Sequence, residues 1–219
     1  MTKIQLAIAS GTGKDHAARR RTGSVSLIEI DIPAGSPRQI GSFDSIDHPS
    51  YLAWSARHSA LFVAGERPDI DGLVTALALG KGDFSAIGER QTGGNGAVHL
   101  CLDRTGSHLF AANYQDSDPA EQVSVAVFPI LADGRLGQIS GSASHHGHGK
   151  DPGRQNRPHC HGVAISPDNR LLAAVDLGTD SVYLYRFDAT TGTIALATQL
   201  TLPAGCAIPP SIRPARSSM

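Results

Sequence analysis

An internal repeat is the feature of this sequence that most constrains its fold. The stretch YLAWSARHSALFVAGE (51–66) aligns without a gap to HLCLDRTGSHLFAANY (99–114), at an offset of 48 residues. A third copy, GVAISPDNRLLAAVDL (162–177), follows at an offset of 63, and polar loops around 116–122 and 140–157 accommodate the extra residues. Self-similarity in this range of periods indicates an array in which each unit buries its apolar surface against its neighbours.

Each copy has the same order of four short strands. An apolar strand, a polar turn and a second apolar strand come first. An alternating third strand follows in GLVTALAL (72–79), QVSVAVFPI (122–130) and SVYLYRF (181–187). A fourth edge strand completes the unit, and no segment sustains a helical period. KIQLAIAS (3–10) and GSVSLIEIDI (23–32) fit this scheme in part.

The size of the unit indicates a β-propeller. Four strands in about 48 residues is the length of one propeller blade. An all-β sandwich with coincidental similarity is the alternative. The gapless match is against it, because the polar turn is repeated along with the apolar positions. The sequence therefore predicts an all-β fold, a partial β-propeller of about four four-stranded blades.

The end of the sequence does not continue the repeat. A fifth copy would begin near residue 209, where the chain reads AGCAIPPSIRPARSSM (204–219), and its prolines exclude a central strand. We expect a partial propeller over residues 1–205 and an irregular tail over 206–219, in place of the next blade. Such an incomplete ring leaves open strand edges and one uncovered sheet face.

Composition and charge narrow the class of protein. Lys+Arg number 19 against 20 Asp+Glu, so the formal net charge of -1 does not suggest capture of nucleic acid or of an anionic membrane. The three cysteines are an odd number without framework spacing, which favours a reducing compartment. The apolar stretch at the N-terminus is too short for a signal peptide or a membrane span. We expect a cytoplasmic protein.

Histidines stand at equivalent places in successive copies, just before or within the first strand. In a propeller the first strands of all blades converge on a central channel, so these side chains are expected to face one small-molecule site. The residues concerned are His48, His99, His159 and His161. Asn113 and Asp176 match each other at the end of the second strand, with Tyr114 beside Asn113.

Two features of this region have structural or metal-binding alternatives. The His-x-His of His159 and His161, with His145, His146 and His148 upstream, could bind zinc. No Cys or Glu stands at an obvious completing distance, so we predict no metal. In DLGTD (176–180), the two aspartates can cap turn amides and Gly178 can supply a positive φ.

Three segments together resemble a known family. They are HPSYLAWS (48–55), ANY (112–114) and RQNRPHCHGVAISPDNRLLAAVDLGTDSVYLYRFD (154–188). They resemble the bacterial lactonase family of 6-phosphogluconolactonases, seven-bladed propellers similar to the fungal carboxymuconate-lactonizing enzyme. The resemblance covers nearly all of residues 1–205. Family chains are longer and continue after LPAG (202–205) with a Gly-Pro-Arg-His strand start, so this chain is expected to be truncated after about four of seven blades.

The resemblance implies a carboxylic ester hydrolase that opens a sugar-phosphate lactone in the pentose phosphate pathway, without a cofactor. Such a reaction needs a base for water, donors for the oxyanion and cations for phosphate. The family motif nominates Arg154, Gln155, His159 and His161. We expect His161 to be the base, Arg154 the anion clamp and His159 a further catalytic residue. The expected substrate-binding residues are Gln155, His99, Asn113, Tyr114 and Asp176.

Two other functions remain open at this point. One is lactonizing or cycloisomerase activity on a carboxymuconate-type substrate, with the same cations binding carboxylates. The other is a noncatalytic propeller that only binds a partner, either by descent or because blades are missing. The grouping of Arg154, Gln155 and the two histidines at one blade entrance favours the enzyme, whereas the missing blades favour weak or no turnover. The sequence leaves the oligomeric state open.

Overall fold

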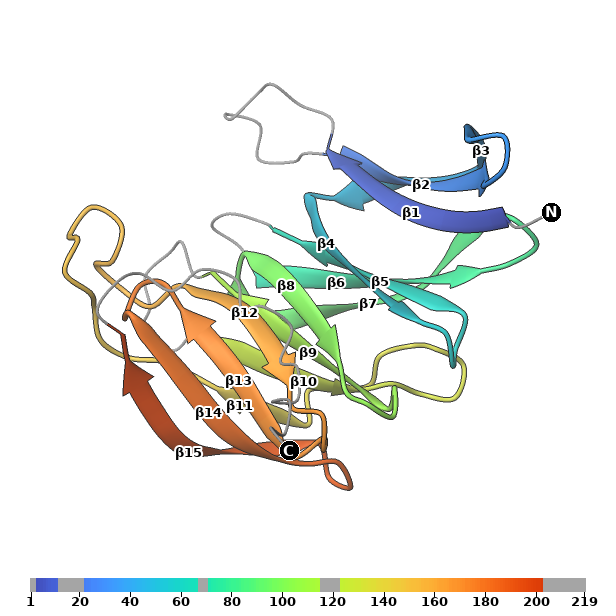
Figure 1. Ribbon diagram of the computed structural model, residues 1–219. Coiled ribbons are helices and arrows are strands. Elements are labelled where there is room, and N and C mark those ends of the chain that lie inside the picture. Colours follow the sequence, from blue (N-terminus) through green and yellow to red (C-terminus); the bar gives the residue numbers. More distant parts are fainter. Residues whose placement is uncertain (1–2, 12–21, 67–70, 115–122, 203–219) are drawn as a thin grey trace, which may run out of the picture.

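A computed structural model describes residues 3–11, 22–66, 71–114 and 123–202, which form fifteen β-strands in four antiparallel sheets (Figure 1). In these ranges no helix has the length and apolarity needed to cross a membrane. The strands of the first two sheets are β1 (Lys3–Gly11), β2 (Thr22–Asp31) and β3 (Ser36–Asp47), then β4 (Pro49–Ser55), β5 (Ala60–Gly65), β6 (Asp71–Leu79) and β7 (Phe84–Asn95). The others are β8 (Ala97–Leu102), β9 (His108–Asn113), β10 (Val125–Pro129) and β11 (Gly141–Ala143), then β12 (Cys160–Ile165), β13 (Leu171–Asp176), β14 (Ser181–Asp188) and β15 (Thr193–Thr201).

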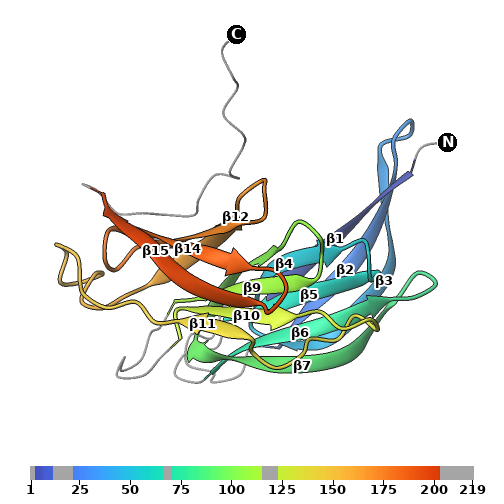
Figure 2. The same ribbon diagram turned by 90° about the horizontal axis from the view of Figure 1, so that it is seen from below.

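The repeat in the sequence corresponds to the sheets of the structure. In the three complete sheets the strands follow one another in chain order from one edge to the other. β4 lies beside β8, and β8 lies beside β12. Figure 2 shows the sheet β1–β3 at one end of the row and β12–β15 at the other. The predicted all-β, propeller-type fold is therefore confirmed.

The first sheet differs from the predicted blade of four strands, because it has three. Its last strand, β3, ends at Asp47, and β7 ends at Asn95, the same position in the 48-residue register. β1, β2 and β3 thus correspond to the second, third and fourth strands of the next sheet. The predicted tail, 206–219, lies outside the described residues.

The middle sheets are buried on both faces, which explains why their central strands are continuous apolar runs rather than alternating ones. In β9, Leu109 and Ala111 pack toward the preceding sheet. Phe110 and Ala112 of the same strand pack toward the following sheet. The smaller cluster around Val25 joins the first sheet to the second in the same way. Each sheet is therefore held in place by its neighbours.

One face of β1 has no sheet packed on it among the described residues. Ile4, Leu6 and Ile8 alternate along β1 and are 40%, 43% and 50% exposed. Ala7 and Ala9, which point the other way, pack against the cluster shared with the second sheet. Isoleucine and leucine are usual in buried strands, so this face has the composition of a buried surface although it is exposed here.

The polar turns of the repeat are built on one capping residue each. Both oxygens of Asp103 accept hydrogen bonds within the β8–β9 turn, among them the amides of Ser107 (2.6 Å) and His108 (2.8 Å). Ser166 of the next repeat accepts the Leu171 amide at 2.9 Å. Asp103 also accepts the Asn169 side chain at 3.0 Å and so ties the turns of two sheets together.

We predict that Asp103→Asn destabilises the protein by about 1–3 kcal/mol, because buried amide donors lose a charged acceptor. Burial alone would raise the pKa of Asp103, but hydrogen bonds from Thr105, His108 and Asn169 outweigh it and hold that pKa below its ordinary value. Its stabilisation is present above the unfolded-state pKa and is lost as pH falls through the lowered one. Urea unfolding at pH 7 measures the effect.

Asp133→Asn is the matched control. Its carboxylate is exposed and pairs with Arg135 at the surface, so we expect a much smaller change in stability. Equal effects of the two substitutions would contradict the role given to Asp103.

Candidate active site

A β-bulge occurs at the same point of the first strand in each complete sheet. The pairing skips one residue between Pro49 and Tyr51, between Ala97 and His99, and between Cys160 and Gly162. The residues left unpaired occupy equivalent repeat positions; they are Ser50, Val98 and His161. Bulges re-aim a side chain and recur next to active sites. The sequence register placed His161 at this entrance, and the structure adds the bulge.

Side chains of one first strand reach the backbone of the next. Ser50 Oγ of β4 donates to the carbonyl oxygen of Ala97 in β8 at 2.8 Å. His99 Nδ1 of β8 accepts the amide of Val163 in β12 at 3.4 Å. These contacts confirm that the first strands converge, as expected of a propeller. They also satisfy edge groups that have no strand partner on that side.

Five rings from these strands and their ends form a cluster, which we call the ring cluster. Tyr51 packs on His99 with ring centroids 4.2 Å apart. Tyr114 stacks on His159 at 4.4 Å and meets the edge of His161 at 5.7 Å. His99 in turn accepts the amide of Val163, which lies on the same strand as His161. The ring cluster therefore consists of Tyr51, His99, Tyr114, His159 and His161.

Burial sets the protonation of His99. Desolvation first, and the charge of His161 second, lower its pKa from 6.5 to about 4. Both effects disfavour the imidazolium form. His99 is therefore a neutral ring at physiological pH.

His159 is held by both its backbone and its ring. Its Nδ1 lies 2.7 Å from the carbonyl oxygen of Tyr114, and its amide donates to Asp176 Oδ1 at 2.9 Å. His161 differs, because its Nδ1 is buried and has no hydrogen-bond partner among the described residues. An unpaired buried polar atom beside other imidazoles marks a place where a ligand or water can bind.

Asp176 is the buried acceptor that holds the backbone next to the ring cluster. Its carboxylate is fully buried and accepts the amides of His159 and Thr179. Its other oxygen lies 2.6 Å from Nδ1 of His145, whose Nε2 is 2.9 Å from the hydroxyl of Tyr185. His145 also stacks on Tyr183 at 3.7 Å. Sequence reasoning considered His145 only as a possible zinc ligand and did not predict its buried pair with Asp176, which lies 31 residues away in the chain.

Three other predicted residues lie outside the ring contacts. Gln155 is buried, with its amide donating to Leu177 O (2.8 Å) and Asp180 Oδ1 (2.6 Å). Asn113 is also buried; it donates to Val123 O at 2.8 Å, and its Oδ1 has no partner in the described ranges. Arg154 is exposed, and its guanidinium makes no hydrogen bond with a described residue. Gln155 and Asn113 thus fix loops, whereas Arg154 is free to reach an anion.

The remaining predictions can be placed as well. His48 lies with Nδ1 2.7 Å from Asp47 and adopts a positive φ of 47°. The capping role expected of Asp176 is confirmed. The positive φ expected at Gly178 is wrong, because Asp180 has it instead, at 49°. Gly178 is needed for a different reason: a Cβ there would collide with the carbonyl oxygen of Arg157.

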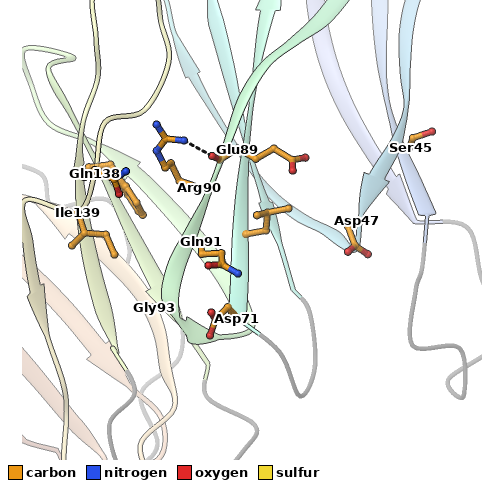
Figure 3. Close-up of a pocket in the computed structure, with 11 residues that line it drawn as sticks. Ser45, Asp47, Asp71, Glu89, Arg90, Gln91, Gly93, Gln138 and Ile139 are labelled. Carbon is orange, nitrogen blue, oxygen red and sulfur yellow. Dashed lines mark hydrogen bonds between the residues drawn. The ribbon is translucent and has the colours of Figure 1, made fainter.

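A separate hollow of about 990 Å³ lies along the outer strands, and Figure 3 shows its residues. It contains none of the predicted site residues. Asp47, Asp71 and Glu89 line it, while the Arg90 guanidinium is engaged by the carbonyl oxygens of Glu89 and Gly137. Three carboxylates disfavour a phosphorylated ligand, so the ring cluster is the better candidate. In the described part of the chain, no group of three or more His, Cys, Asp or Glu is arranged to hold a metal ion.

These features define the class: consecutive antiparallel sheets whose first strands converge on a shared mouth make this chain a segment of a β-propeller. The model of the family described as "Lactonase, 7-bladed beta-propeller" matches residues 7–207. The chain belongs to that family, which confirms the resemblance seen in its motifs.

Individual relatives agree with the family. Over 143 residues the chain is 29% identical to the 6-phosphogluconolactonase of Bacillus subtilis, covering 64% of this chain and 39% of the relative. Over 165 residues it is 24% identical to that of Formosa agariphila, covering 74% and 45%. The solved periplasmic gluconolactonase of Pseudomonas aeruginosa superposes with a TM-score of 0.70 at 28% identity, over 94% of this chain and 56% of that one. The chain therefore spans less than half the length of both curated relatives.

We predict that Asp176→Ala destabilises the protein by about 3 kcal/mol or more, because it leaves His145 and two amides buried without their acceptor. Asp188→Ala, which removes an exposed carboxylate that caps a turn through Thr190, should destabilise the protein much less. Chemical unfolding of both variants distinguishes the two roles. A change in Asp176→Ala no larger than in the control would contradict the buried network.

The lowered pKa of His99 predicts acid sensitivity. The unfolded state binds more protons than the folded state between pH 6.5 and about 4, so stability is lost as pH falls through this window. His99→Gln should lose less stability than the parent chain between pH 7 and 4.5. Urea unfolding at both pH values measures the difference, and parallel losses would argue against burial of a neutral ring.

Proposed function

We propose that this chain is part of a lactone hydrolase of the 6-phosphogluconolactonase type, which opens a sugar-phosphate lactone in the pentose phosphate pathway. The observation that supports this most directly is the ring cluster, which places three histidines at the bulged entrances of two adjacent first strands. Imidazoles titrate near neutral pH and suit proton transfer to and from water. The strained ester of a lactone opens readily, so a modest set of groups is sufficient.

The other predicted residues are given supporting roles in this proposal. Arg154, exposed on the loop before β12, provides a guanidinium for the phosphate. Tyr114 lines the cluster beside two of the histidines. Asp176, Gln155 and Asn113 hold the backbone of the entrance and thereby position the imidazoles. The direct contact of these three with substrate that the sequence suggested stays a prediction.

We also propose a cytoplasmic location. Cys101 and Cys160 are free thiols in the structure, and burial raises the pKa of both. Neither would be drawn readily into oxidation, since the thiolate is the reactive form. Fractionation of the native cells with an antibody against the chain tests this.

A noncatalytic role has one specific observation in its favour. The chain spans 39% and 45% of the length of the curated relatives. We therefore expect turnover by this chain to be weak compared with a full-length relative.

The test is hydrolysis of fresh 6-phosphogluconolactone by the 219-residue chain, corrected for spontaneous opening. We expect a rate above buffer that falls at least about tenfold in His161→Ala, because an imidazole at the mouth is lost. Parent and variant rates that both equal buffer would leave only the noncatalytic role.

A second measurement addresses the substrate class. Arg154→Gln should raise KM for 6-phosphogluconolactone about tenfold or more while leaving KM for glucono-δ-lactone, which has no phosphate, nearly unchanged. Lys150→Gln is the matched control, an exposed cation in the same loop. A similar change with both lactones in Arg154→Gln would contradict the phosphate-binding role.

A further inference from the structure

Two imidazoles of the ring cluster make main-chain hydrogen bonds of opposite sense. His159 Nδ1 lies 2.7 Å from the carbonyl oxygen of Tyr114, and a carbonyl oxygen can only accept. Nδ1 of neutral His159 must therefore bear the hydrogen, which leaves Nε2 with a lone pair. His99 Nδ1 receives the amide hydrogen of Val163. Nδ1 of His99 must therefore be bare, which leaves the hydrogen on Nε2.

Packing fixes the plane of each ring, and the main-chain hydrogen bond fixes which nitrogen faces the backbone. The Tyr114 ring lies almost parallel to His159, at 22° and 4.4 Å, and Tyr51 covers His99 at 4.2 Å. Rotating either ring by 180° about its Cβ–Cγ bond would leave it in the same plane, against the same partner, but would give up its hydrogen bond to the main chain. His99 has a pKa of about 4, so it remains a neutral donor throughout the neutral pH range.

Neither Nε2 atom forms a hydrogen bond with any residue in the described ranges. β12 joins the two rings, since His161 of this strand contacts Tyr114 by its edge and Val163 of the same strand donates its amide hydrogen to His99. One end of the cluster thus offers a basic nitrogen and the other a hydrogen-bond donor. A reaction that moves a proton while charge develops on an oxygen needs this pair of groups.

We propose that His159 is the general base through Nε2, and that His99 donates a hydrogen bond through Nε2–H to the lactone carbonyl oxygen; this rests on the proposed function. His161 then contacts the substrate between them and is not the base, in contrast to the expectation from the motif alone.

The reaction balances with these groups. His159 Nε2 takes a proton from water as the water oxygen bonds to the carbonyl carbon. The carbonyl π electrons move onto the oxygen that His99 Nε2–H holds. When the carbonyl re-forms, the bond from the carbon to the ring oxygen breaks. The imidazolium of His159 returns its proton to that oxygen, which leaves a hydroxy acid and a neutral base.

The tautomers can be measured without any turnover. Long-range ¹H–¹⁵N correlation spectra of the ¹⁵N-histidine-labelled chain distinguish Nδ1–H from Nε2–H rings, and the single variants His99→Gln and His159→Gln assign the signals. At pH 7 we expect His159 as the Nδ1–H tautomer and His99 as the Nε2–H tautomer. Reversed tautomers, or a protonated His99 at pH 7, would overturn the assignment.

Two pairs of variants separate catalysis from structure. Asparagine places its amide nitrogen near the Nδ1 position, and glutamine places it near Nε2. His159→Asn keeps a donor for the Tyr114 carbonyl but lacks the base, so we expect a loss of about 10²–10⁴ in kcat. His161→Asn should lose about tenfold. His99→Gln, which keeps a donor at Nε2, should retain several times the activity of His99→Asn.

Each outcome has one interpretation. If His159→Asn retains activity while His161→Asn loses it, His161 is the base and the inference is wrong. If His99→Asn equals His99→Gln, His99 is not a donor to the reacting oxygen. If the parent chain shows no turnover, the proposed function fails for this chain and the catalytic roles fail with it, whereas the spectra still decide the tautomers. Circular dichroism of each variant confirms that it has folded.

Discussion

The burial of both faces of each middle sheet is the constraint on which the rest of the structure depends. A strand such as β9 sends Leu109 and Ala111 to one neighbour and Phe110 and Ala112 to the other. Neither middle sheet can shift without disturbing two interfaces of close-packed apolar side chains. This fixes the relative positions of β4, β8 and β12, although their hydrogen bonds run within separate sheets. The same packing therefore fixes the positions of the rings that these strands carry.

The site itself is built where the regular hydrogen bonding stops. The first strand of each sheet has one edge without a strand partner, and there the side chains of Ser50 and His99 bind the backbone of the adjacent sheet. The same contacts that satisfy these edges orient the rings. In His99, one hydrogen bond therefore supports the fold and also selects which nitrogen bears the hydrogen. The buried pair of Asp176 and His145 also supports the site, because Asp176 accepts the backbone amide of His159 and so fixes the position of that residue.

The sequence was sufficient for the strands and their order, since both follow from a gapless repeat and apolar runs. It also predicted that His99, His159 and His161 lie at the starts of first strands, because the segments 96–99 and 159–162 are equivalent in the repeat, although the three histidines hold different positions within it. It did not assign their roles. Those depend on which backbone group faces Nδ1 of each ring, and no local pattern encodes that. Gln155 illustrates the same limit, because its partner Asp180 is 25 residues away in the chain.

Because the bulge recurs in all three complete sheets, the side chain at the bulged position can change without a change in the sheet. Ser50, Val98 and His161 project from one interchangeable slot, and the pairing of the sheet around the slot is the same whichever side chain occupies it. A hydroxyl, an aliphatic group and an imidazole have all been accommodated there. Reactive groups could thus be gained, discarded or moved to a neighbouring blade by single substitutions, while the architecture that presents them is inherited unaltered.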